Sequence, residues 1–206
     1  LMKPFDIGDN FTSSIAEPDL STGEGEWSIY SNLPALGVIK FVSSVVVGDV
    51  IVMVADNSDL LHRSTDGGET WSTVALGWTG DRPRCLGSYG SVMLVFGGAG
   101  RIYKSTNLGV TWSAFKTAGS AQLNHCAASY DLTVTASAFG VYKSIREGDY
   151  SQITVDGLVL SIAISGKILM IATNGSNGYR ILRSDDGQAL TLSPVDIPIN
   201  KPQYVA

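Results

Sequence analysis

Short apolar segments separated by turn-forming residues follow one another along most of the chain. Residues 38–45 are largely apolar and lead to a turn at Gly48-Asp49, a second apolar run covers 50–55, and a third, 60–63, follows the polar residues 56–59. Runs of this length, bounded by Gly, Asp, Asn and Ser, are typical of β-strands. The apolar positions do not follow the period of an amphipathic helix. The pattern therefore predicts an all-β fold of short strands.

The same succession of strands recurs at a nearly constant interval. Each copy ends in a serine-led turn, and the four serines, Ser64, Ser105, Ser144 and Ser184, are 41, 39 and 40 residues apart. A period near 40 residues with four strands per unit is typical of a β-propeller, in which each unit is one four-stranded blade. The sequence predicts four complete blades. A solenoid of β units is the alternative architecture.

The turns resemble a known repeat. Residues 64–71, S-T-D-G-G-E-T-W, resemble the Asp-box or BNR repeat, S-x-D-x-G-x-x-W, through Ser64, Asp66, Gly68 and Trp71. The later copies are in register but less complete. The second keeps Ser105, Gly109 and Trp112 with Asn107 at the Asp place, the third keeps Ser144 and Gly148, and the fourth keeps Ser184 and Asp186.

These turn residues are interpreted as structural. Asp and Ser side chains accept hydrogen bonds from nearby backbone N–H groups, glycine reaches positive φ without a steric cost, and a tryptophan ring buries a large apolar area. We expect Asp66 to stabilise its turn, not to catalyse a reaction or bind a metal. No metal or cofactor is predicted.

Three regions are expected along the chain. Residues 1–36 are polar and turn-rich and are interpreted as an extended N-terminal arm that ends in a strand near Trp27; residues 37–195 form the propeller; residues 196–206 form a tail or the start of a further blade. The strand near Trp27 resembles the last strand of a blade whose other strands are missing. The chain is therefore a piece of a longer protein, or its four blades close by themselves, or a partner chain completes the ring. An unpaired strand is an adhesive edge, which favours contact with another chain or domain.

The two cysteines, Cys85 and Cys126, are 41 residues apart, about one repeat. Equivalent positions in neighbouring blades face the same way. The interpretation is two buried free thiols, without the neighbouring His that a nucleophile or a zinc site needs.

A ligand site is expected on the face opposite the serine-led turns. The candidates are Trp78, Arg82, Arg84, Asn124, His125, Asn174 and Asn177. An aromatic ring with Arg and Asn suits contact with a glycan, whereas the plainer interpretation is ordinary polar loops.

Asp-box proteins include sialidases, so the resemblance raises the question of an enzyme. A sialidase-like site needs converging arginines, a tyrosine nucleophile with a glutamate partner, and an acidic aspartate. All five glutamates fall in the arm or in the serine-led turns, on the wrong face. The two carboxylates of other glycosidases are equally hard to place, although Asp56, Asp59 and Asp81 lie near the expected ligand face. We therefore expect no enzyme.

Charge and hydropathy argue against two classes of binding partner, nucleic acids and the membrane interior. The net charge is −5 and there is no basic run, which argues against a nucleic acid, and the longest apolar stretch is too short to span a bilayer. The N-terminal arm, with residues 4–10 and 12–18, loosely resembles the start of bacteriophage tail and virion adaptor proteins. The sequence thus predicts a non-catalytic interaction propeller that binds virion proteins or itself and is located in the virion. The alternative is a glycan-binding or glycosidase fragment that is secreted.

Overall fold

A computed structural model describes residues 40–56, 58–77, 82–175, 178–185 and 193–195. The described residues form sixteen β-strands in four four-stranded antiparallel sheets, each with its strands in chain order. Blades 1 and 2 consist of β1 (Phe41–Val47), β2 (Val50–Ala55), β3 (Leu60–Ser64) and β4 (Ser72–Ala75), and of β5 (Pro83–Tyr89), β6 (Val92–Gly97), the 3-10 turn η2 (Gly98–Gly100), β7 (Arg101–Ser105) and β8 (Ser113–Thr117).

Blades 3 and 4 repeat this order. They consist of β9 (Leu123–Ala128), β10 (Leu132–Ser137), β11 (Gly140–Ile145) and β12 (Ser151–Ile153), and of β13 (Leu158–Ser165), β14 (Ile168–Gly175), β15 (Gly178–Ser184) and β16 (Ser193–Val195). The four sheets match the four predicted repeats. The N-terminal arm and the residues after Val195 lie outside the described residues.

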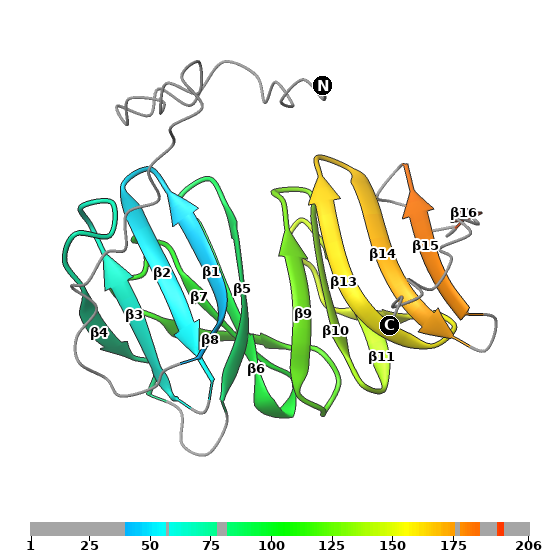
Figure 1. The fold of residues 1–206 in the computed structure, drawn as a ribbon, viewed down its shortest axis with the longest axis horizontal. Coiled ribbons are helices and arrows are strands. Elements are labelled where there is room, and N and C mark those ends of the chain that lie inside the picture. Colours follow the sequence, from blue (N-terminus) through cyan, green and yellow to red (C-terminus); the bar gives the residue numbers. More distant parts are fainter. Residues whose placement is uncertain (1–39, 57, 78–81, 176–177, 186–192, 196–206) are drawn as a thin grey trace, which may run out of the picture.

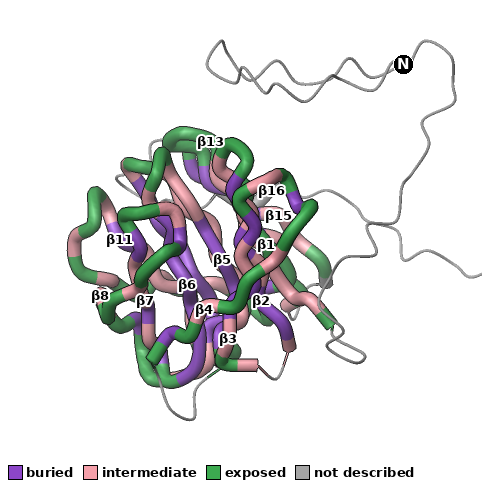
Figure 2. The backbone as a smooth tube through the Cα atoms, turned by 90° about the vertical axis from the view of Figure 1, so that its left-hand side faces the viewer, coloured by how far each residue is buried: buried purple, intermediate pink, exposed green. Residues whose placement is uncertain are grey.

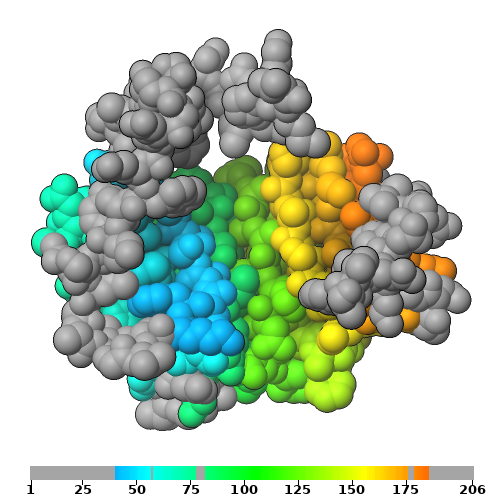
Figure 3. Space-filling view, viewed as in Figure 1, coloured from blue at the N-terminus to red at the C-terminus, as the bar shows by residue number. Residues whose placement is uncertain are grey.

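The blades form an arc. The first strands of successive blades, β1, β5, β9 and β13, contact one another in that order, and Figure 1 shows them side by side with the outer strands extending away on both sides. Figure 2 shows that the buried segments lie within the sheets, whereas many of the turns are exposed. In Figure 3 the atoms of blade 1 (blue) and blade 4 (yellow) lie on either side of the green inner strands. Blades 1 and 4 are therefore the two ends of a row.

Apolar clusters fill the junctions between blades. Alternate residues of β2, such as Val52 and Val54, pack with Met93 and Val95 of β6, and all four are fully buried. A second cluster joins blades 2 and 3 around Phe96 and Leu123, and a third joins blades 3 and 4 around Val134 and Ile171. The period-2 alternation of the strands explains this, because each middle strand buries one set of side chains against the preceding blade and the other against the next.

Every first strand carries a β-bulge at the same position. The pairing register shifts between Phe41 and Ser43, Pro83 and Cys85, Leu123 and His125, and Val159 and Ser161. The extra residue is thus Val42, Arg84, Asn124 or Leu160. In each blade it lies six residues before the first residue of the hairpin turn, which is Gly48, Gly90, Tyr130 or Gly166. A bulge bends a strand and redirects its side chains.

The prediction of free thiols was wrong, because Cys85 and Cys126 form a disulfide between blades 2 and 3. The bulges show that Cys85 is equivalent to His125, 40 residues later, and not to Cys126. The cysteines are thus one residue out of step, and successive residues of a strand face opposite sides of its sheet. Cys85 therefore faces blade 3, and Cys126 faces blade 2.

Candidate functional site

The serine-led turn of blade 1 is closed by its own side chains. Ser64 Oγ accepts a hydrogen bond from the Gly68 N–H at 2.9 Å and donates one to Asp66 Oδ1 at 2.7 Å. Asp66 also accepts bonds from the backbone N–H and the hydroxyl of Thr70. Trp71 Nε1 donates to the Gly68 carbonyl at 2.9 Å. Each group thus satisfies a polar partner within the turn.

The turn of blade 2 has the same arrangement although Asn replaces Asp. Ser105 Oγ accepts from the Gly109 N–H at 2.9 Å, Asn107 Oδ1 accepts from the Thr111 N–H at 3.0 Å, and Trp112 Nε1 donates to the Gly109 carbonyl at 3.1 Å. The amide of Asn107 therefore supplies the same acceptor without a charge. A carboxylate is not required for this geometry.

The third and fourth turns depart from this pattern. Ser144 Oγ donates to the Gly148 carbonyl at 2.6 Å, and both Arg146 and Glu147 adopt positive φ. Ser184 is buried, and Asp186 lies outside the described residues.

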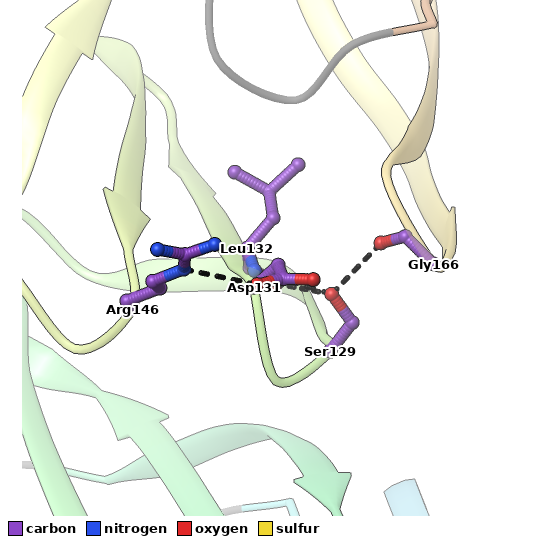
Figure 4. A network of polar contacts seen from close by, with 5 residues as sticks. All are labelled: Ser129, Asp131, Leu132, Arg146 and Gly166. Carbon is purple, nitrogen blue, oxygen red and sulfur yellow. Dashed lines mark hydrogen bonds and ion pairs between the residues drawn. The ribbon is translucent and has the colours of Figure 1, made fainter.

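The third turn binds the neighbouring blade instead. Glu147 Oε1 accepts hydrogen bonds from the Tyr89 hydroxyl and from Lys104 Nζ of blade 2. The Lys104 hydrogen bond is the largest cause of the lowered pKa of Glu147, and burial is the largest cause of the raised pKa of Tyr89. Farther along this face, Ser129 Oγ donates to the Gly166 carbonyl of blade 4 at 3.0 Å (Figure 4). The face that carries the serine-led turns, called here the turn face, thus holds the blades together.

The charge state of Asp66 provides a prediction. Hydrogen bonds from Thr70 lower its pKa from 3.8 to about 2. A folded-state pKa below the unfolded value stabilises the fold above the unfolded pKa, and this stabilisation is lost as the pH falls towards 2. We expect the melting temperature of the wild type to fall more between about pH 5 and pH 2 than that of Asp66→Asn, which imitates Asn107. Thermal unfolding followed by circular dichroism measures both; equal slopes would contradict the role assigned to Asp66.

The opposite face is formed by the turns between second and third strands and by the connections between blades, and we call it the connector face. Of the predicted ligand residues, Arg84, Asn124, His125 and Asn174 lie at this end of their strands, and Arg82 lies in the connection just before β5. Trp78 and Asn177 lie outside the described residues. The bulges place Arg84 and Asn124 at equivalent positions of neighbouring blades.

Two of these residues have defined environments. Arg84 pairs with Asp56 of blade 1, so the guanidinium joins two blades and the carboxylate is held by a cation. His125 has a pKa lowered by burial, which favours its neutral form at pH 7.

A cavity that sequence reasoning missed lies between blades 3 and 4 on the connector face. It has a volume of about 230 Å³ and is lined by Ser137–Gly140, Gln152–Val155, Gly157 and Val159. Phe139, at the tip of the β10–β11 turn, is 81% exposed beside it. Ser137 Oγ accepts from the Phe139 N–H, and Gln152 Nε2 donates to the Phe139 carbonyl, so the turn is fixed on both sides. The sequence signal that could have indicated this site is an aromatic residue, Phe139, in a tight hairpin turn.

The described residues contain no group of three or more His, Cys, Asp and Glu side chains that could bind a metal ion. Within the same ranges, no helix has the length and apolarity needed to cross a membrane.

The comparisons with known proteins concern the fold. No family model matches the chain, and no curated protein matches it. Among solved structures it is similar to YCF48 from Cyanidioschyzon merolae, with 16% identity, a TM-score of 0.60, and coverage of 78% of this chain and 57% of that chain. It is also similar to a chain of a nidogen/laminin complex (12% identity, TM-score 0.62, coverage 75% and 64%) and to U3-55K (12%, 0.59, coverage 69% and 48%).

The chain spans about half the length of YCF48 and U3-55K. At these identities the likeness concerns the fold alone. The similar structures are β-propellers. Together with the four antiparallel sheets in chain order, they confirm the predicted fold class: this chain is an all-β protein with the β-propeller fold.

Proposed function

We propose that the chain is a non-catalytic interaction propeller that binds another polypeptide on the connector face. The observation that carries this proposal is the 81% exposed Phe139 beside a cavity of about 230 Å³. A large aromatic side chain next to a concavity is the arrangement that supplies most of the binding energy at protein interfaces. The fixed β10–β11 turn reduces the entropy lost on binding.

Two of the similar structures are complexes with proteins. One is described as YCF48 bound to D1 peptide, with 18% identity to this chain, and another as a nidogen/laminin complex. They support protein binding as a use of this fold.

The finer form of the proposal is a bacteriophage virion component that docks on other virion proteins through the N-terminal arm. It is supported by the resemblance of residues 4–18 to virion adaptor proteins. The disulfide between Cys85 and Cys126 suits virion surfaces and the extracellular space, where disulfides persist. The second candidate, a secreted glycan-binding propeller, is favoured by Arg84 and Asn124 at equivalent positions of neighbouring blades on the connector face.

Substitution of Phe139 tests the binding surface. Peptides are selected from a displayed random library on the immobilised wild-type chain, and their affinities are measured by calorimetry. We expect Phe139→Ala to weaken binding about ten-fold or more, because truncation of an aromatic anchor costs over 1 kcal/mol. The matched control is Val110→Ala, since Val110 is also exposed (52%) but lies in a serine-led turn. This control should bind like the wild type.

Three results would contradict parts of the proposal. Equal losses for both variants would remove the connector face as the binding surface. Hydrolysis of fluorogenic glycosides, or binding to a glycan array in place of peptides, would support the second candidate. Purified phage particles that incorporate the chain equally well after residues 4–18 are replaced by a Gly/Ser linker of equal length would contradict docking through the arm.

A further inference from the structure

Both ends of the arc have a sheet face that no described blade covers. We call the side of a blade turned towards the next blade its trailing face, and the side turned towards the preceding blade its leading face. No described blade packs on the trailing face of blade 4 or on the leading face of blade 1. Five of the nine exposed large hydrophobic residues in the described part of the chain belong to blade 4: Leu158, Leu160, Ile168, Met170 and Tyr179.

Comparison of equivalent positions shows that the trailing face of blade 4 is built to be covered. The third residue of each second strand is Val52, Leu94, Val134 or Met170. The first three are at most 1% exposed because the next blade packs on them, whereas Met170 is 41% exposed. Exposed apolar side chains gathered on one face mark an interaction site, and the face also carries Arg183, which pairs with Met170 across the two strands.

The leading face of blade 1 shows the complementary difference. Its fourth second-strand residue is Met53, and the equivalents Val95, Thr135 and Ile171 are all fully buried against the preceding blade. Met53 is partly exposed, and Val46, which pairs with Ile51 on the same face, is 58% exposed.

The junctions within the chain show how such faces meet. At the first two junctions, the residue that follows the bulge in one blade contacts the second residue after the bulge in the next blade. At the first junction Ser43 Oγ accepts from the Leu86 N–H at 2.9 Å, and at the second Cys85 is bonded to Cys126. Continuing the series, Ser161 on the trailing face of blade 4 would meet Ser44 on a leading face of the type that blade 1 presents.

Both uncovered faces lie on the same side of the molecule. In Figures 1 and 3 the sheets of blades 1 and 4 are turned towards the viewer on either side of the inner strands. A two-fold rotation about an axis parallel to those strands keeps their direction. It places the trailing face of each blade 4 opposite the leading face of the other blade 1, so that one association step forms two equal junctions.

We propose that a second copy of this chain covers both faces, so that two arcs of four blades close a ring of eight blades. A second copy supplies both faces that the described blades of one arc leave uncovered, the leading face of blade 1 and the trailing face of blade 4. A second copy also brings the two required faces in the correct strand direction. The proposal rests on the fold and is independent of what the connector face binds.

Cysteine cross-linking tests this arrangement on the 206-residue chain. We expect Ser44→Cys and Ser161→Cys, mixed as two single variants and oxidised, to form a covalent dimer of twice 21.8 kDa. Peptide mapping should identify the bond as 44 to 161. Neither single variant should cross-link alone, because the two-fold axis separates identical positions. The wild-type chain should have the dimer mass by light scattering.

A charged substitution on the trailing face of blade 4 provides a second test of the dimer. Met170→Lys should shift the chain to monomers and raise the dissociation constant at least about 100-fold, because the junction would then bury a second cation beside Arg183, the cross-strand neighbour of position 170. Val110→Lys on the turn face is the control and should remain dimeric, and circular dichroism verifies that both fold. A wild-type monomer at high micromolar concentration, cross-linking of Ser44→Cys with itself, or open polymers in place of a dimer would each overturn the two-fold ring.

Discussion

Replacement of both Cys85 and Cys126 by alanine is expected to lower the free energy of unfolding by about 3–4 kcal/mol. The bond closes a loop with a sequence separation of 41 residues, and cross-linking a loop of about this length removes that much conformational entropy from the unfolded chain. For a chain of this size the melting temperature should fall by about 10 °C. Thermal unfolding of the variant and the wild type measures the difference.

A reductant serves as the control for this prediction. It should lower the melting temperature of the wild type by a similar amount and leave the double variant unchanged, since that variant has no bond to reduce. A wild type that melts at the same temperature with and without reductant would show that the bond does not stabilise the junction between blades 2 and 3.

Phe96→Ala is expected to cost about 3–5 kcal/mol, the usual range for truncating a buried aromatic ring. Phe96 is fully buried on the trailing face of blade 2 and packs in the cluster with Leu94, Ile102 and Leu123. The loss combines the transfer free energy of the ring with the cavity that it leaves. Urea unfolding, with the slope compared between variants, measures the change.

Phe96→Leu is the graded control, because it keeps most of the apolar volume and should lose less than half as much. A loss below about 1 kcal/mol for the alanine variant would mean that this junction is not closely packed. If both variants lost the same free energy of unfolding, the shape of the ring and not its buried volume would determine the stability of this junction.

The blades could be predicted because each is a local unit. A hairpin turn such as Gly48-Asp49 and a serine-led turn such as 64–71 mark strand ends directly in the sequence, and apolar runs mark the strands between them. Contacts between blades were harder to predict, because the strand register decides to which side of the sheet a side chain points. The spacing of 41 between the cysteines does not reveal the bulge before Cys85 or the repeat of 40 residues at this junction. This difference of one residue turns Cys126 towards Cys85, so the prediction of two free thiols was wrong.

For the candidate site, the positions of residues along the strands could be predicted from the sequence, but their side-chain contacts could not. Strand order alone placed Arg84, Asn124 and Asn174 at one end of the blades. It did not predict that Asp56 pairs with Arg84 across two blades, because that contact depends on where a bulge directs a side chain. Phe139 was missed because a single residue in a turn has no periodic signal.

Hydrogen exchange of the wild-type chain with and without a selected peptide tests the central claim, that the connector face is the binding surface. Binding at the connector face predicts slowed amide exchange in 137–140, 152–155 and Gly157, which line the cavity, and unchanged exchange in the serine-led turns 64–71 and 105–112. Protection confined to those turns, with none around Phe139, would contradict it.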